Sequence, residues 1–214
     1  MDKRVKIVTG DYRLADFRQR AMMRDLFGEN AEHCYEIYFH WYNLIHELGH
    51  AIAMFNSPER PDPAEEEQKV NDFAVAYWRR FGEEEKLRDL GSIVECALSG
   101  LKAPSESGHM KYAKEKWGQA DFYSFNNYGW FQFSCVKDAL SRKECLSRTL
   151  SALGVRLAIS EETMVLRYNE DENMARKVVA DAVSTLRRWG VTLPEEVPVA
   201  FCDDLNCQML ADEE

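Results

Sequence analysis

The chain contains an H-E-x-x-H pattern, His46-Glu47-Leu48-Gly49-His50, in a stretch whose hydrophobic periodicity predicts a helix from Ala31 to Phe55. Side chains four residues apart lie above one another on one helix face, so the two imidazoles can bind a single metal ion. Glu47, about 100° further round the helix, can reach a water on that metal without being a ligand. Zinc would lower the pKa of such a water toward ~7, and the carboxylate could take its proton. The pattern therefore predicts metal-dependent hydrolysis.

The helix around this pattern has an apolar stripe, and the two histidines lie beside it. The residues of the stripe recur at spacings of three and four: Tyr38, Trp41, Ile45, Leu48, Ile52 and Phe55. His46 and His50 lie roughly 100–140° round the helix from the stripe, a position that favours the wall of a cleft. The competing interpretation is that a short pattern of this kind arises by chance and forms only a polar edge.

A catalytic zinc site needs a third protein ligand and leaves its fourth position for water. Prolines at positions 58, 61 and 63 end the first helix, and a second helix is predicted from Ala64 to Phe81. Glu66 and Glu67 lie on either side of the apolar face of this second helix, whereas Glu65 points away from it. Acidic residues at a helix start can also serve only to compensate the helix dipole. From the residues alone, Glu66 and Glu67 remain alternatives for the third ligand.

A second pattern follows the first, Glu67-Gln68-Lys69-Val70-Asn71-Asp72-Phe73-Ala74. Together the two resemble the ImmA/IrrE family of zinc metallopeptidases, whose pattern is H-E-L-G-H and later E-x-x-A-N-x-F-A; here Val70 stands in place of the alanine. The resemblance covers about residues 42–78. It implies that Glu67 is the third zinc ligand, with Asn71 close to the histidines. It also implies a regulatory bacterial or phage protease that acts on a protein such as a repressor.

This chain departs from that family in the region before the metal-binding helix. Relatives place several strands there, and the edge of one holds the substrate in extended form. Here a single strand is expected, around Arg4 to Thr9, so peptide capture by strand addition is not predicted.

Zinc peptidases often use a tyrosine or a histidine to stabilise the oxyanion of the reaction. The aromatic stretch from Phe122 to Phe133 offers Tyr123 and Tyr128, and His109 lies shortly before it. These three residues are the candidates for an oxyanion or substrate contact. The alternative, which their amino-acid types favour, is that the aromatic side chains fill the core beneath the metal-binding helix.

Composition restricts the other function classes. The chain has 214 residues and a net charge of −10, so it lacks the basic surface that binding to nucleic acid requires. No window resembles a membrane span or a signal peptide. The six cysteines include no C-x-x-C pair, as is usual for unpaired thiols in a reducing compartment. A cytoplasmic protein is expected, with a protein or peptide substrate and with neither a nucleic acid nor a membrane as partner.

The expected fold is mainly α (α+β), with a small sheet and an antiparallel, zincin-like helix pair holding the metal. A loop at Ser99–Gly108 separates a zinc-binding part, residues 1–100, from a helical part, residues 101–214, that should pack on it within one domain. The further elements expected are helices at Tyr12–Phe27, Glu83–Leu98, His109–Trp117, Val136–Leu153 and Glu172–Trp189, strands at Val155–Ile159 and Thr163–Tyr168, and an extended tail from Val191.

The sequence therefore predicts a gluzincin-like zinc metallopeptidase. His46, His50 and Glu67 would bind zinc, and Glu47 would activate the water. The alternative is a non-hydrolytic regulatory or binding protein that keeps a zincin-like scaffold for its stability. Glu47 favours the enzyme, because a purely structural metal site has no use for a general base.

Overall fold

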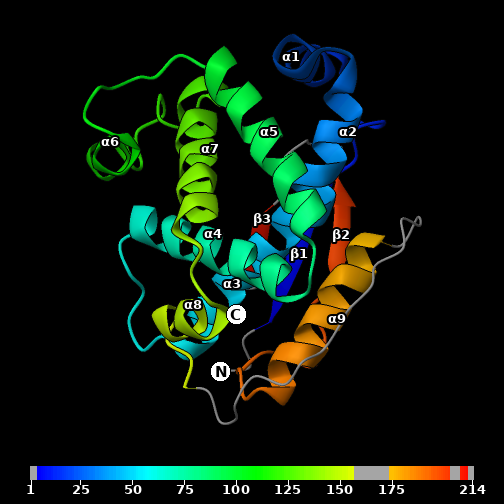
Figure 1. Ribbon diagram of the computed structural model, residues 1–214, viewed down its shortest axis with the longest axis vertical. Helices are drawn as coiled ribbons and strands as arrows, with labels where there is room; N and C mark the ends of the chain where they lie inside the picture. Colours follow the sequence, from blue (N-terminus) through cyan, green and yellow to red (C-terminus); the bar gives the residue numbers. More distant parts are fainter. Residues whose placement is uncertain (1–3, 157–173, 203–207, 212–214) are drawn as a thin grey trace.

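The computed structural model describes residues 4–156, 174–202 and 208–211, and helices predominate among them (Figure 1). In chain order the elements are β1 (Val5–Gly10), α1 (Phe17–Phe27), the 3-10 turn η1 (Gly28–Asn30), α2 (Ala31–Tyr35), the π-helix η2 (Glu36–Tyr42), α3 (Asn43–Asn56), α4 (Pro63–Arg80), α5 (Glu84–Gly100), α6 (His109–Lys116), α7 (Phe125–Arg142), α8 (Leu146–Ala152), α9 (Met174–Arg188), β2 (Val199–Cys202) and β3 (Gln208–Ala211). The mainly α fold with a minor sheet is confirmed.

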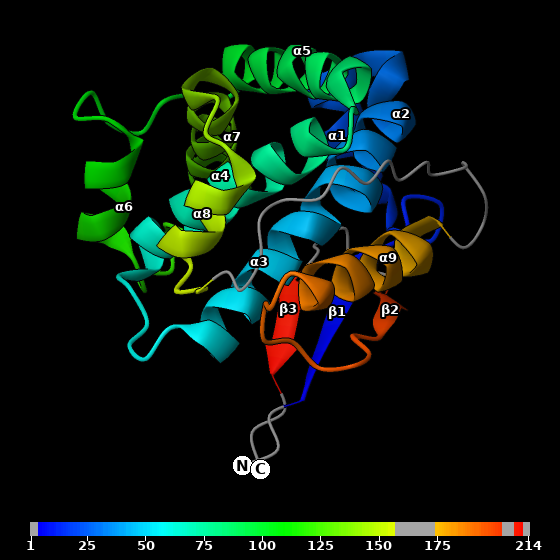
Figure 2. The same ribbon diagram turned by 60° about the horizontal axis from the view of Figure 1, so that its bottom comes forward.

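The sheet has β1 at its centre, with β2 parallel on one side and β3 antiparallel on the other. Ile7 of β1 lies opposite Val199 of β2 and Met209 of β3. Figure 2 shows the three strands side by side, with α9 lying across them. The predicted strand at Arg4–Thr9 is confirmed. The extended tail expected from Val191 is wrong, because this segment supplies the two strands that pair with the backbone groups of β1.

Helix α1 begins later than the periodicity over Tyr12–Phe27 predicts. The Asp16 carboxylate accepts hydrogen bonds from the backbone N–H groups of Arg18, at 2.7 Å, and Gln19, at 2.9 Å. Aspartate in this position caps the free N–H groups of a helix start. The cap therefore places the first helical residue at Phe17, and the residues before it form a turn.

The stretch predicted as one helix from Ala31 to Phe55 is helical throughout but is not uniformly wound. Between α2 and α3, Glu36–Tyr42 forms a π-helix of seven residues. Wide turns of this kind are rare and occur frequently at functional sites. This segment buries Tyr38, Trp41 and Tyr42 directly before the histidines of α3.

Helix α4 follows the prolines as expected: Pro63 is its first residue, and the Asp62 carboxylate accepts from the N–H of Ala64. Helix α7 does not follow the prediction of one helix over Val136–Leu153. It begins at Phe125, inside the aromatic stretch, and a break after Arg142 separates it from α8. The two strands predicted at Val155–Ile159 and Thr163–Tyr168 fall almost wholly outside the described residues.

One large hydrophobic core takes side chains from both parts of the chain, from Val5 in β1 to Val199 in β2. A smaller cluster lies between the start of α4, α6 and α7, and its buried members are Ala64, Tyr112, Ala113, Phe122, Phe131 and Cys135. Much of the aromatic stretch is therefore core, as its amino-acid types favoured. None of the helices in the described ranges is long and apolar enough to cross a membrane.

Candidate metal centre

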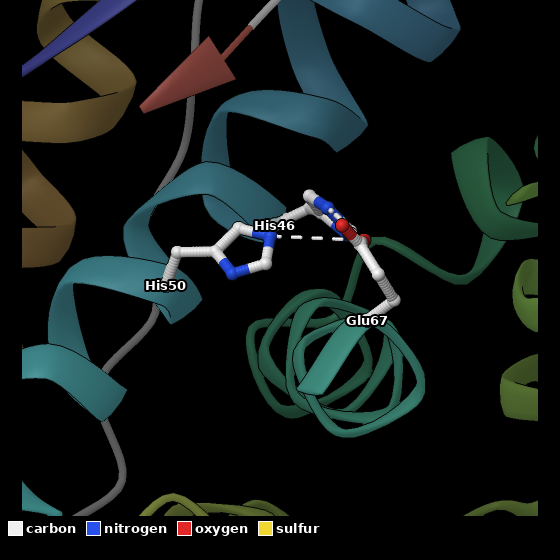
Figure 3. A group of neighbouring side chains, drawn as sticks. All are labelled: His46, His50 and Glu67. Atoms are coloured by element: carbon white, nitrogen blue, oxygen red, sulfur yellow. Dashed lines mark ion pairs between the residues drawn. The ribbon is translucent and has the colours of Figure 1, made fainter. Parts of the chain in front are cut away.

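The imidazoles of His46 and His50 and the carboxylate of Glu67 meet between α3 and α4 (Figure 3). One ligand atom from each lies within 4.8 Å of the other two. The Oε2 atom of Glu67 is 3.3 Å from Nε2 of His46 and 3.7 Å from Nε2 of His50. These three side chains can hold a metal ion, because two imidazoles and a carboxylate present their donor atoms to one point.

The two helices that carry these ligands approach each other closely. Figure 3 shows α4 end on while α3 runs across the view, so the two helices cross where their side chains meet. Gly49 lies at this approach, where an added Cβ would be 2.9 Å from Cβ of Val70 and 3.1 Å from Cδ1 of Phe73. Glycine between the two histidines thus allows the carboxylate on α4 to come within reach of both imidazoles.

The ring of His46 is oriented by neutral, buried groups. Its Nδ1–H donates to Oδ1 of Asn71 at 3.1 Å, and the hydroxyl of Tyr42 donates to the same oxygen at 2.7 Å. The amide nitrogen of Asn71 donates to the backbone carbonyl of Glu67 at 2.8 Å, which fixes the direction of the side chain. Because Nδ1 carries the proton, Nε2 of His46 can present a lone pair to a metal.

The ring of His50 is oriented by charged groups. Its Nδ1–H donates to Oε1 of Glu66 at 2.8 Å, and the guanidinium of Arg60 forms a two-pronged ion pair with the same carboxylate. Glu66 therefore faces Nδ1 of His50, on the far side of the ring from the three ligand atoms. The residues alone left Glu66 and Glu67 as alternatives for the third ligand. In the structure it is Glu67 whose carboxylate faces the Nε2 atoms of both histidines.

Helix α7 supplies the groups that hold Glu67. The side-chain amide of Gln132 donates to Oε2 of Glu67 and to the hydroxyl of Tyr128, both at 2.8 Å. The Tyr128 hydroxyl lies 3.4 Å from Oε1 of Glu67. Burial, and then the charge of Glu67, raise the pKa of Tyr128 well above its ordinary value, so its hydroxyl stays protonated.

Glu47 lies beside the three ligands without being one of them. Its Oε1 atom is 4.0 Å from Nε2 of His46 and accepts from the side-chain amide of Asn43 at 3.2 Å. Glu47 is buried in the protein yet lines the pocket in front of the ligands. A carboxylate so placed can exchange a proton with a molecule bound at the ligand set.

The site has a strong negative field in the absence of a cation. Burial lowers the pKa of His50, but the carboxylates of Glu67 and Glu66 outweigh burial and raise it to about 10. Burial raises the pKa of Glu67, yet the charges and hydrogen bonds of His50 and His46 hold it well below its ordinary value. The protein thus places a buried carboxylate where a proton, or a divalent cation, must supply the positive charge.

A pocket of about 690 Å³ opens in front of the ligands. Glu47, both histidines and Glu67 line it at one end, and helices α1 and α7 supply much of its remaining wall. The volume lies within the range of roughly 300–1,000 Å³ that is usual for ligand pockets.

The three candidates for an oxyanion or substrate contact lie in different places. Tyr128 reaches Glu67, and Tyr123 lines the pocket with half of its surface exposed. His109 is at the start of α6, packed against Trp130 and 3.8 Å from Asp138, and it does not line this pocket.

Several groups in the site were missed by the sequence reasoning. Gln132 lies one helical turn after Tyr128, a spacing that would have pointed to it if the start of α7 had been recognised. Tyr42 and Arg60 carried no signal of their own, because one belongs to an apolar stretch and the other to the proline-rich loop.

Comparisons with protein-family models, with curated proteins and with solved structures gave no significant match.

Proposed function

We propose that this protein is a zinc-dependent peptide hydrolase, and the observation that carries the proposal is the placement of Glu47 in the same pocket as the His46, His50 and Glu67 ligand set. A metal site that served stability alone would need neither a carboxylate beside its ligands nor an opening in front of them. The resemblance of residues 42–78 to the ImmA/IrrE metallopeptidases points to the same chemistry.

The donor set fits zinc better than the alkaline-earth ions. Calcium and magnesium prefer oxygen ligands, whereas two imidazole nitrogens and one carboxylate form the set found in several catalytic zinc sites. Both imidazoles are held by acceptors at Nδ1, Asn71 for His46 and Glu66 for His50, as is usual for histidines that bind a metal through Nε2. A zinc ion held by these three residues would keep its fourth position for water.

Zinc held by these residues supplies Lewis-acid chemistry, which polarises a carbonyl and lowers the pKa of a water toward ~7. Glu47 accepts a proton from the attacking water while the oxygen of that water bonds to the peptide carbonyl carbon. Glu47 then delivers that proton to the leaving nitrogen as the C–N bond breaks, which gives a carboxylic acid and an amine. The protonated hydroxyl of Tyr128, which donates to Oε1 of Glu67 in this structure, is a candidate donor on the pocket wall to the oxygen that gains charge.

The rival proposal, a metal-stabilised regulatory protein without hydrolysis, differs in what it requires of Glu47. Glu47→Gln keeps the shape of the side chain and removes its ability to take a proton. We expect this variant to bind zinc as the wild type does and to lose at least 100-fold in peptide cleavage, within the range typical for a general base.

Zinc content and cleavage of a quenched peptide library, measured on both proteins, test the proposal. Equal cleavage by wild type and Glu47→Gln would remove Glu47 from the chemistry. Absence of chelator-sensitive cleavage in the zinc-loaded wild type would leave the regulatory alternative in its place.

A further inference from the structure

The pocket in front of the metal ligands changes character away from them. The ligand end presents histidine and glutamate side chains from α3 and α4, whereas α1 presents one polar residue, Gln19, and four apolar residues, Met22, Met23, Leu26 and Phe27. Met22 and Leu26 are one turn apart on α1 and only half buried, so their side chains are available to a molecule in the pocket. Methionine adapts its shape to different apolar partners.

A cluster of rings continues this apolar wall toward the ligands. The ring centroid of Phe133 lies 6.4 Å from that of Phe27 and 4.8 Å from that of Tyr38. All three residues line the pocket. Phe133 directly follows Gln132, which holds the carboxylate of Glu67. The apolar wall and the metal ligands are therefore parts of one continuous pocket.

The pocket also has exposed aromatic residues in its wall. Among the residues that the structure describes, the large apolar side chains with substantial exposure are Leu14, Phe17, Tyr123 and Phe125. Two of these, Tyr123 and Phe125, line the pocket at the start of α7. Exposed apolar groups that adjoin a pocket are typical of a site where a partner's apolar group is bound.

None of the pocket-lining residues that the structure describes belongs to a strand. The central strand β1 is paired on both sides, by β2 and by β3. The described lining residues come from helices and from loops. The helices are α1, α2, η2, α3, α4 and α7, with Glu67 the residue from α4, and the loops are those before α4 and before α7. The described part of the pocket wall therefore offers helix and loop side chains, and no strand backbone, to a bound molecule.

We infer that the pocket is a specificity site for a bulky apolar side chain, aromatic or long aliphatic, next to the peptide bond that is cut. The inference rests on the proposed function and adds the substrate class. The side chain would lie between Met22 and Leu26 of α1 and Phe133 of α7, with the adjoining carbonyl at the metal ligands. Burial of one such side chain favours it over a methyl group by at least tenfold in affinity.

Three small hydroxamates test the inference without requiring catalysis, since each binds zinc through the same group. The probes are acetohydroxamate, which has only a methyl group, 3-phenylpropionohydroxamate, which carries an aromatic ring, and succinic acid monohydroxamate, which carries a carboxylate. Titration calorimetry on the zinc-loaded full chain should give the aromatic probe at least tenfold tighter binding than either of the others. Equal affinities for the three probes would overturn the inference, even if peptides are cleaved.

A matched pair of variants locates the aromatic probe. Met22→Glu places a carboxylate in the apolar wall, and Ala21→Glu places the same group on the adjacent exposed position outside this pocket. We expect Met22→Glu to reduce the preference for the aromatic probe to within threefold and Ala21→Glu to leave it unchanged. Met22→Ala, a milder change, should reduce the preference partly and guards against misfolding of the glutamate variant. An aromatic preference that persists in both Met22 variants would place the ring elsewhere and overturn the inference.

The outcomes also separate this inference from the proposed function. An aromatic preference lost in Met22→Glu, without any chelator-sensitive peptide cleavage, would support the apolar site and reject hydrolysis. A failure of the wild type to bind zinc would reject both.

Discussion

The two histidines of the candidate metal centre stand one turn apart on α3, yet their surroundings differ in kind. His46 is held by the neutral amide of Asn71, to which Tyr42 also donates. His50 is held by the carboxylate of Glu66, which is itself paired with Arg60. The neutral surroundings are buried, whereas Arg60 lies half exposed on the loop before α4.

The difference separates two tasks that a metal site requires. The neutral groups around His46 fix the orientation and the tautomer of the ring without adding charge to the interior. Although burial lowers the pKa of His50, the charge of Glu67 and the hydrogen bond to the Glu66 carboxylate raise it, which keeps a proton on the ring in the absence of a metal. Neighbouring carboxylates of this kind make a ligating imidazole more basic and raise its affinity for metals.

The largest expected effect comes from the two adjacent glutamates. Glu67→Gln removes a ligand, and we expect zinc affinity to fall by more than the ~100-fold that is the upper end for a group outside the ligand set. Glu66→Gln keeps all three ligands but replaces the carboxylate that faces His50 and pairs with Arg60 by a neutral amide, and it should lower affinity by about tenfold. Competition with a zinc chelator measures both. Equal losses in the two variants would contradict the separate roles given to the two carboxylates.

Asn71→Ala tests the neutral groups that orient His46. The variant leaves Nδ1 of His46 and the Tyr42 hydroxyl without their acceptor, so zinc affinity should fall ~10–100-fold. The unsatisfied buried groups should also lower the free energy of unfolding by about 1–3 kcal/mol. Asn126→Ala removes hydrogen bonds to Lys102 and Asn127 and none to His46, His50 or Glu67, so this control should leave zinc affinity unchanged. A full-affinity Asn71→Ala protein would show that His46 needs no such support.

The spacing between the two helices is tested at Gly49. A methyl group there meets Val70 at 2.9 Å, and Gly49→Ala should therefore lower the free energy of unfolding by about 1–3 kcal/mol. Gly91→Ala in α5, whose added Cβ meets only Leu140 at 3.9 Å, should raise it by up to ~1 kcal/mol through helix propensity. Denaturant unfolding of the metal-free proteins measures both. An unchanged free energy of unfolding in Gly49→Ala would mean that α3 and α4 can move apart without loss of stability.

The charged groups around His50 predict a dependence of stability and of zinc binding on pH. The pKa of His50 rises from 6.5 to about 10 on folding, so its contribution to stability is complete below pH 6.5 and is lost as the pH rises through about 10. Metal-free protein should show this titration in the NMR signal of the His50 ring, and Glu66→Gln should move it to lower pH. Zinc binding at pH 7.5 should release at least one proton, because the metal displaces the one on His50. Zinc binding without proton release would contradict a charged His50.

The spacing of residues predicted the parts of the site that lie within one helix turn or two. His46, Glu47 and His50 follow from the period of α3, and the resemblance placed Glu67 and Asn71 near them. The periodicity could not choose between Glu66 and Glu67, because the choice depends on how α4 crosses α3 at Gly49. Gln132 could not be predicted, because the apolar pattern places the start of α7 too late. The helix in fact begins after a cap formed by Ser124, so that Gln132 lies within it.

The fold was predictable in its helices and less so in its sheet. Amphipathic periodicity located α4 and α5 closely, because each buries one continuous face. The strands β2 and β3 lie among prolines and acidic residues and have only four residues each, too short to show an alternating pattern. Both strands pair with the backbone of β1, some 190 residues earlier in the chain, a partner that local sequence does not reveal.

The position of a bound zinc ion tests the central claim most directly. Crystals of the zinc-loaded protein, measured on both sides of the zinc absorption edge, should give one anomalous peak per chain. The peak should lie about 2.0–2.2 Å from Nε2 of His46, from Nε2 of His50 and from one carboxylate oxygen of Glu67. A peak on Glu66 or on the cysteines, or no peak at all from a chain saturated with zinc, would contradict the account.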